Sequence, residues 1–322
     1  MADDAPLNLM QRAAEKLKAL GSQGAPAQGV SSPAAPGQSQ GAPIQPAPAA
    51  PARAAEPVAA PPQATPLRRK ESQQASIDIN RLILAGMVSP RGDKTLISEE
   101  YRILKRPLLL KAFSEEGRTE DAHVIMVTSS LPGEGKTFTA INLAMSIASE
   151  SDLNVLLVDG DVMNPSILPR LGVEAKLGLT DLLGDSQLDL SDVLMRCENV
   201  PNLTLLPAGT PTPRATELLA SHRMGSLMTD LAKRYTDRVI VIDTPPVLAT
   251  SEPSVMALHV GQILLVVEAE KTSQSAIEAS LRQLTRCPNI SLMLNKASSA
   301  SSSEQFGGYG SYGYGAYAQR RN

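Results

Sequence analysis

A run of small and charged residues, SLPGEGKT at 130–137, has the composition of a phosphate-binding loop. Gly133 and Gly135 let backbone N–H groups close around phosphate oxygens, and a helix starting behind them adds its partial positive charge. Lys136 is expected to reach the β- and γ-phosphates of a nucleotide, and the Thr137 hydroxyl to bind Mg²⁺. Ser130 stands where the usual pattern has its first glycine. The alternative is an ordinary strand–helix turn. The predicted nucleotide-binding residues of this run are Ser130, Pro132, Gly133, Glu134, Gly135, Lys136, Thr137 and Phe138.

Two further apolar runs end in carboxylates. VIVIDTPP at 239–246 places Asp243 at the end of a predicted strand, where an acidic residue can hold a metal directly or through water. VLLVDGDVMNP at 155–165 supplies Asp159 and Asp161. Asp159 is placed either to accept a proton from a nucleophile or to bind the metal. A strand that ends in an aspartate cap or an Asp-Gly turn is the alternative for each run. Together the motifs predict phosphoryl chemistry with ATP and Mg²⁺.

The segment FGGYGSYGYGAY at 306–317 contains four of the six tyrosines in the chain. Glycine and serine between them keep the backbone flexible, so each phenol is expected to be exposed. One interpretation is a phosphate-acceptor tail, and the other is a weakly associating low-complexity segment. Extended chain from Lys296 to Tyr309 and Tyr317 covers about 43 to 69 Å, which reaches this chain's own site or that of a neighbour. The predicted phosphoacceptors are Tyr309, Tyr312, Tyr314 and Tyr317.

The elements that must position these residues are apolar strands alternating with amphipathic helices. Strands are predicted at 123–129, 154–159, 203–207, 238–243, 262–267 and 290–295, and helices near 136–149, 214–220, 222–235 and 272–286. A further helix is predicted to be capped by Ser98. This alternation predicts an α/β fold, a P-loop NTPase-type parallel sheet flanked by helices, which binds ligands beyond the carboxyl ends of its strands.

The chain divides by composition into four parts. Residues 1–20 predict a short amphipathic helix, which either docks on a partner or membrane surface or folds back on the body. Residues 21–76 are rich in Pro and Ala and predict a disordered linker. Residues 77–297 are predicted to form the catalytic domain, and residues 298–322 are predicted to form a disordered Tyr-rich tail.

Composition excludes several classes of function. The net charge of −3 gives no overall basic field, so we expect no nucleic-acid partner. The two cysteines, Cys197 and Cys287, fit neither a disulfide framework nor a metal cluster and indicate a reducing compartment. The acidic N-terminal segment lacks the apolar core of a signal peptide, and no run approaches the 18 or so apolar residues of a membrane span. A cytoplasmic location is expected.

With PGEGKT, VDGD, VIDTPP and the tyrosine cluster, the sequence resembles the bacterial tyrosine kinases (BY-kinases) of capsular and exopolysaccharide systems. The resemblance extends over about residues 95 to 317 and includes PAGTPTPRATELL at 207–219. The N-terminal pattern LMQRAAEKLKAL and the segment SEEYRILKRPLL are similar to the exosortase-associated autokinase branch. The resemblance implies MgATP-dependent autophosphorylation of the tail between subunits of a ring. It also implies a membrane-embedded co-polymerase or activator at the inner membrane and a cognate phosphotyrosine phosphatase.

Residue by residue, the resemblance assigns catalytic roles to Lys136, Asp159, Asp161 and Asp243, metal binding to Thr137, Asp159 and Asp243, and adenine contact to Asn295. The family's oligomerisation pattern Glu-x-x-Arg-x-x-Arg appears as Glu99, Arg102 and then Lys105, with Arg106 next to it. Lysine lacks the two-pronged hydrogen bonding of arginine, so this contact is expected to be altered. Where relatives often carry arginine after the second aspartate, this chain has Met163 and Asn164.

Two other functions are compatible with a P-loop. A partitioning or septum-positioning ATPase of the deviant-Walker class would hydrolyse ATP with water, but that class carries a signature lysine where this chain has Leu131. A non-catalytic adaptor would bind ATP only to set its shape and would contact partners through residues 7–20 and the tail.

Overall fold

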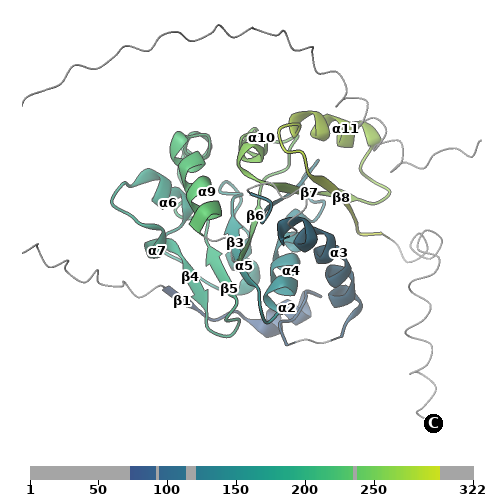
Figure 1. Cartoon of the computed structure of the whole chain (residues 1–322), viewed down its shortest axis with the longest axis horizontal. Helices are drawn as coiled ribbons and strands as arrows, with labels where there is room; N and C mark the ends of the chain where they lie inside the picture. Colours follow the sequence, from purple (N-terminus) through teal and green to yellow (C-terminus); the bar gives the residue numbers. More distant parts are fainter. Residues whose placement is uncertain (1–72, 92–93, 114–120, 235–237, 298–322) are drawn as a thin grey trace, which may run out of the picture. The chain divides into compact units, whose positions relative to one another are not determined.

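The computed structural model describes residues 73–91, 94–113, 121–234 and 238–297, which build an eight-stranded sheet between two layers of helices (Figure 1). The strand order is β1-β4-β5-β3-β6-β2-β7-β8. The strands are β1 (Gln73–Ala75), β2 (Val124–Ser129), β3 (Asn154–Asp159), β4 (Met195–Cys197), β5 (Leu203–Leu206), β6 (Arg238–Asp243), β7 (Gln262–Glu268) and β8 (Ile290–Asn295). All neighbouring strands are parallel except β4 and β5. The predicted parallel sheet is therefore confirmed with one antiparallel exception, which arises because the short connection between β4 and β5 allows only a hairpin.

Both faces of the sheet are buried, which explains why its strands are continuous apolar runs. Every residue of β2 is buried, and its side chains alternate between the two layers. Ile125 and Val127 pack in one core cluster, and Val124 and Met126 pack in the other. The chain thus builds two cores on one sheet from Leu, Ile, Val, Met and Ala.

The helices divide between these two cores. One layer is formed by α2 (Ile79–Leu84), α3 (Leu96–Phe113), α4 (Lys136–Ala148) and α5 (Ile167–Leu171). The opposite layer is formed by α6 (Leu179–Gly184), α7 (Leu190–Val193), α8 (Ala215–Leu219), α9 (His222–Arg234), α10 (Glu252–Met256), the short 3-10 helix η1 (Ala257–His259) and α11 (Gln274–Gln283). The helices predicted near 136–149, 214–220 and 222–235 are confirmed as α4, α8 and α9.

The cap predicted for the helix after residue 95 is wrong by three residues. Thr95, not Ser98, caps α3: the Ser98 N–H donates to Thr95 Oγ1 at 3.2 Å, and the Thr95 N–H donates to Ser98 Oγ at 3.0 Å. This reciprocal pair is a capping box, in which the third helical residue satisfies the cap residue. The helix predicted at 272–286 is shorter, because Ser273 caps α11 by accepting from the Ala276 N–H at 3.2 Å.

The ordered domain begins earlier than predicted. β1 starts at Gln73, inside the segment predicted as linker, and pairs with β4. The predicted N-terminal helix at 1–20, most of the linker and the tyrosine tail at 298–322 lie outside the described residues. Within the described ranges, no helix has both the length and the apolarity that crossing a bilayer requires.

Candidate active site

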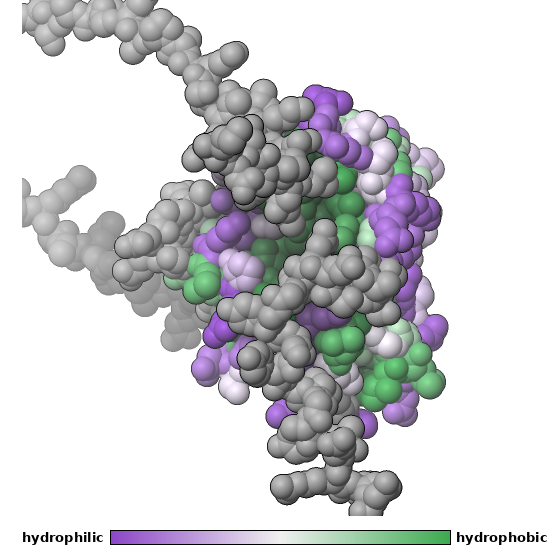
Figure 2. Space-filling view, turned by 90° about the vertical axis from the view of Figure 1, so that its right-hand side faces the viewer, coloured by the Kyte–Doolittle hydropathy of each residue, from purple (hydrophilic) through white to green (hydrophobic). Residues whose placement is uncertain are grey.

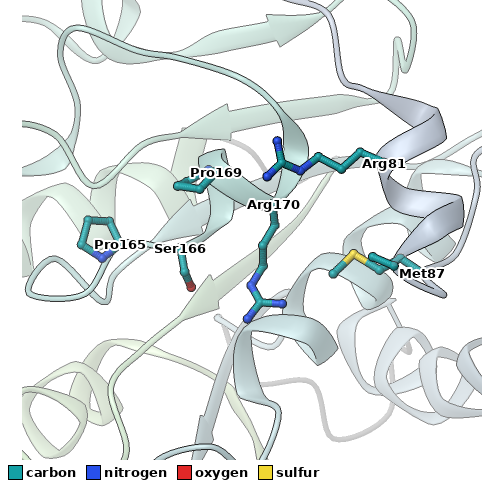
Figure 3. Close-up of a pocket in the computed structure, with 7 residues that line it drawn as sticks. Arg81, Met87, Pro165, Ser166, Pro169 and Arg170 are labelled. Atoms are coloured by element: carbon teal, nitrogen blue, oxygen red, sulfur yellow. The ribbon is translucent and has the colours of Figure 1, made fainter.

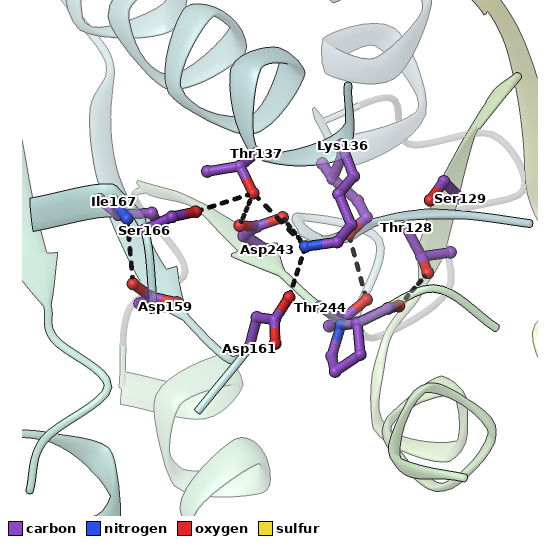
Figure 4. Close-up of polar contacts among 12 residues, drawn as sticks. Thr128, Ser129, Lys136, Thr137, Asp159, Asp161, Ser166, Ile167, Asp243 and Thr244 are labelled. Atoms are coloured by element: carbon purple, nitrogen blue, oxygen red, sulfur yellow. Dashed lines mark hydrogen bonds and ion pairs between the residues drawn. The ribbon is translucent and has the colours of Figure 1, made fainter. Parts of the chain in front are cut away.

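Three parallel strands bring the predicted motifs to one edge of the sheet. β2 leads into the 130–135 loop, and α4 begins at Lys136 directly behind it. β3 and β6 are neighbours, and their register places Asp159 opposite Asp243. A Cβ added at Gly160 would lie 2.7 Å from the Asp243 carbonyl oxygen, so only glycine fits where the two strand ends approach. Register alone therefore sets two carboxylates side by side below the phosphate-binding loop (Figure 4).

The loop itself has the backbone that its glycines allow. Gly133 and Gly135 have φ values of 85° and 102°, a region that other residues rarely adopt. The buried Glu134 side chain holds the loop from within: it accepts from the Leu131 N–H at 2.7 Å and from the Thr272 hydroxyl. These bonds fix the conformation of the loop from its inner side.

The end of β8 supports the same loop from outside. Asn295 Nδ2 donates to the Glu134 carbonyl at 2.8 Å, and Lys296 Nζ donates to the Gly133 carbonyl at 2.8 Å. Lys296 also pairs with Glu268 at 3.2 Å. The last strand thus ends beside the phosphate loop, whereas adenine contact by Asn295 stays a prediction.

Lys136, Thr137, Asp161 and Asp243 form one hydrogen-bonded cluster (Figure 4). Lys136 Nζ lies 2.5 Å from Asp161 Oδ2 and 3.9 Å from Asp243 Oδ1. The Thr137 hydroxyl donates to Asp243 Oδ2 at 2.6 Å. The Lys136 ammonium group thus lies between two carboxylates, at the place where it is expected to meet nucleotide phosphates.

Asp159 lies at the side of this cluster and is tied to the next element. Its Oδ2 accepts from the Ile167 N–H at 3.2 Å, at the start of α5. Ser166, directly before α5, donates to Thr137 Oγ1 at 3.3 Å. Sequence analysis missed Ser166, because a serine after a proline carries no signal of its own.

Burial and like charge raise the pKa values of the two paired carboxylates. For Asp159, desolvation is the main cause and the Asp243 charge the next, and the pKa rises to about 7. For Asp243, desolvation raises the pKa to about 6 against the opposing effects of Lys136 and the Thr137 hydroxyl. Arg170 on α5 also lowers the pKa of Asp243. No sequence motif marks this arginine.

The donor set fits Mg²⁺. Asp159, Asp161 and Asp243 each keep one buried oxygen without a hydrogen-bond partner in the described part of the chain. Mg²⁺ takes carboxylate and hydroxyl oxygens and is completed by water and phosphate oxygens, so one or two protein carboxylates suffice. Accordingly, the described ranges hold no self-sufficient metal cluster of three or more His, Cys, Asp or Glu residues.

The remaining predicted residues take less direct positions. The Phe138 side chain is partly buried and packs against the core on the α4 side of the sheet. Pro132 is exposed at the tip of the loop. Met163, which is 56% exposed, and Asn164 supply no cation to the site, as their types predict.

Comparisons with known proteins agree with this geometry. Residues 122–295 match the family model described as an AAA domain. The chain is 29% identical over 223 residues to "Tyrosine-protein kinase YwqD" of Bacillus subtilis (strain 168), covering 68% of this chain and 88% of that protein. It is 33% identical over 162 residues to "Putative tyrosine-protein kinase EpsB" of Ralstonia solanacearum, covering 50% of this chain but only 21% of that protein.

Among solved structures, the kinase domain of VpsO is similar with a TM-score of 0.54 and 33% identity. The match covers 63% of this chain and 97% of that domain.

Proposed function

The chain belongs to the AAA domain family and is a bacterial protein-tyrosine kinase, and we propose that it phosphorylates the tyrosines of its own tail and thereby regulates exopolysaccharide or capsule synthesis and export. The observation that carries this proposal is the convergence of Lys136, Thr137, Asp161 and Asp243 at one sheet edge, with Asp159 beside them. The tail with Tyr309, Tyr312, Tyr314 and Tyr317 follows the strand that ends at this edge.

Each residue of the cluster has a task in transferring the γ-phosphoryl group. The loop amides and Lys136 would bind the phosphates, and Thr137 and Asp243 would hold Mg²⁺, with Asp159 as a further candidate ligand. Mg²⁺ neutralises charge on the phosphate oxygens when it is bound. As the alternative to binding the metal, Asp159 accepts the proton of the attacking tyrosine hydroxyl. A bond forms between the phenol oxygen and the γ-phosphorus, the bond to the β–γ bridging oxygen breaks, and ADP leaves.

The test is tail phosphotyrosine measured by mass spectrometry after incubation with MgATP. Wild type is expected to carry phosphate on the tail tyrosines, and Lys136→Met to carry none. Lys271→Met removes a lysine that is 73% exposed outside the cluster and serves as the matched control. Equal phosphate on wild type and Lys136→Met would contradict the proposal, and so would ATP turnover without protein-bound phosphate.

A ring of subunits is part of the proposal, and α3 supports it. Leu96, Ile103 and Leu110 are spaced by seven residues and are 71%, 72% and 65% exposed. Figure 2 shows the side of the molecule that carries α3, where apolar surface lies beside polar surface. Beside this stripe Arg102 pairs with Glu99 at 2.5 Å. A second copy of the chain would cover such a face.

The structure corrects one residue of the expected ring contact. Lys105 is only 5% exposed, and its ammonium group donates to the Ser146 carbonyl at 2.5 Å and pairs with Glu150 at 2.6 Å. It therefore joins α3 to α4 within one subunit. Arg106, which is exposed, is the basic residue available to a neighbour.

The remaining partners are proposed on the family's pattern. A membrane-embedded co-polymerase would hold the kinase at the periphery of the inner membrane and activate it, and a cognate phosphatase would reverse the modification. A deviant-Walker ATPase is disfavoured because Leu131, which is 39% exposed on the loop, replaces the signature lysine.

A further inference from the structure

A pocket of about 310 Å³ lies between α2 and α5, beside the proposed active site (Figure 3). Its lining includes Arg81, Met87, Pro165, Ser166, Pro169 and Arg170. This volume is at the lower end of the range of about 300 to 1,000 Å³ for small-molecule sites.

Two exposed arginines, Arg81 and Arg170, line the pocket, and the charge of Arg170 also acts on Asp243 of the catalytic cluster. No carboxylate is among its lining residues. In the described part of the chain, the guanidinium groups of Arg81 and Arg170 have no hydrogen-bond or ion-pair partner. Arginine side chains carry a planar set of donors that matches phosphate oxygens. The pocket is therefore suited to a dianionic phosphate group.

The rest of the lining is apolar and suits a flat ring. Met87, Pro165 and Pro169 provide the apolar walls of the pocket. Proline rings and a polarizable methionine sulfur make favourable contacts with aromatic faces and edges. An aromatic ring that bears a phosphate can contact the apolar residues with its ring and the arginines with its phosphate. Free phosphate or phosphoserine can contact only the arginines.

We propose that the pocket between α2 and α5 binds phosphotyrosine, and that its ligand is a tail tyrosine which has already been phosphorylated. Residues 305–322 contain no Asp or Glu, so phosphorylation is the source of acidic side chains on this segment. This inference rests on the proposed function, because the tail must first receive a phosphate.

The position of the pocket connects it to catalysis. Ser166 lines the pocket and donates to Thr137 in the catalytic cluster, and α5 also supplies the N–H that binds Asp159. Tyr309 and Tyr312 are three residues apart, as are Tyr314 and Tyr317. Three residues of extended chain span about 10 Å. A phosphotyrosine held on α5 would thus present the next tyrosine to the catalytic carboxylates, and the cluster would be modified in succession.

Binding can be tested without kinase activity. A fluorescent peptide of residues 305–322 with phosphate on Tyr312 is titrated against full-length Lys136→Met protein, and the same peptide without phosphate is the comparison. The phosphopeptide is expected to bind at least about tenfold more tightly, and Arg81→Gln or Arg170→Gln to remove that preference. Arg286→Gln, an exposed arginine away from the pocket, is the matched control and is expected to change nothing.

Competitors identify the ligand. Phenyl phosphate is expected to displace the phosphopeptide, and inorganic phosphate at equal concentration to do so weakly. Equal binding of both peptides, or a preference that survives both arginine substitutions, would overturn the inference. Equal competition by phenyl phosphate and inorganic phosphate would also overturn it, since the ring would then contribute nothing.

A time course of intact mass separates this inference from the proposed function. With MgATP, wild type is expected to convert quickly from one phosphate to several, whereas Arg81→Gln in a wild-type background accumulates the singly modified form. The same distribution in both proteins would refute succession. A wild-type protein that acquires no phosphate would instead refute the proposed function, and the peptide titration would still report on the pocket.

Discussion

At the scale of single residues, the buried Asp159 carboxylate destabilises the folded protein when it is ionised. A carboxyl group titrates near about 3.9 in an unfolded chain, whereas burial and Asp243 raise the pKa of Asp159 to about 7 in the folded protein. Between these values the folded state binds more protons than the unfolded state, so stability falls as pH rises through this window. Such a cost is typical of a site prepared for a cation.

Asp159→Asn removes that cost and is expected to stabilise the nucleotide-free protein at pH 7.5 by about 1 to 4 kcal/mol while lowering phosphorylation strongly. Urea unfolding measured across the acidic-to-neutral range checks this, since the fall in stability with pH should flatten in the variant. Asp230→Asn, on the exposed side of α9, is the control and should leave the profile unchanged. A less stable Asp159→Asn protein at neutral pH would contradict the argument.

The two loop glycines provide a second prediction at this scale. Both have positive φ, so alanine at either position costs about 1 to 2 kcal/mol. A Cβ at Gly133 meets nothing within 4 Å, whereas one at Gly135 collides with the Asn295 amide. Gly135→Ala is therefore expected to weaken binding of an ATP analogue more than Gly133→Ala.

Asn295→Ala tests the cause of this difference. It should recover part of the affinity of Gly135→Ala and none of that of Gly133→Ala, as measured by titration calorimetry. Equal recovery in both backgrounds would show that the collision is not responsible.

At the scale of elements, two neighbouring basic residues on α3 have different roles: Lys105 stabilises one subunit, and Arg106 is available to a neighbouring subunit. Lys105→Ala removes a buried ammonium group that joins α3 to α4 through Ser146 and Glu150. We expect a loss of about 2 to 3 kcal/mol in the free energy of unfolding. Arg106→Ala should change stability by less than about 0.5 kcal/mol but weaken subunit assembly.

Urea denaturation and sedimentation velocity measure the two effects separately. If Lys105→Ala altered assembly while leaving stability intact, Lys105 would be the intersubunit contact after all.

The elements also show where sequence analysis succeeds. The bounds of the six longer strands were predicted within one or two residues. These strands are buried on both faces, so each has a continuous apolar sequence. The short elements β1, β4, α2, α5–α7, α10 and η1 were not predicted. Helices of four to six residues are unstable alone and depend on tertiary contacts, such as the Asp159 bond that holds the start of α5.

The residues of the site also divide into those that local sequence motifs predict and those that they do not. Lys136, Thr137 and the three aspartates were predicted because each stands in a motif at the end of a strand. Ser166 and Arg170 were not, since their place beside the catalytic cluster is set by the fold of α5 rather than by any local pattern.

At the scale of the whole molecule, phosphorylation changes the charge balance. The chain has a formal net charge of −3. Four phosphotyrosines would add about −6 to −8 to the tail. The pocket between α2 and α5 can hold one of these groups, and the others should be repelled from a site that already contains three aspartates and nucleotide, which would open a ring held by tail exchange.

Light scattering coupled to size exclusion should therefore show a smaller assembly after treatment with MgATP, and phosphatase should restore the larger one. A variant with Phe at Tyr309, Tyr312, Tyr314 and Tyr317 is the control and should keep its size. The same mass for wild type before and after treatment would refute the switch.

Because the register sets Asp159 opposite Asp243, binding of magnesium at this site is coupled to the release of protons. With a pKa of about 7, Asp159 is about half protonated at neutrality, whereas Asp243, with a pKa of about 6, is mostly ionised there, and a divalent cation that binds them must release the protons that remain. Heat measured on MgATP binding near pH 6.5 should thus depend on the ionisation enthalpy of the buffer, and this dependence should shrink as the solution becomes alkaline. Acidification and magnesium depletion would act on this enzyme as the same signal.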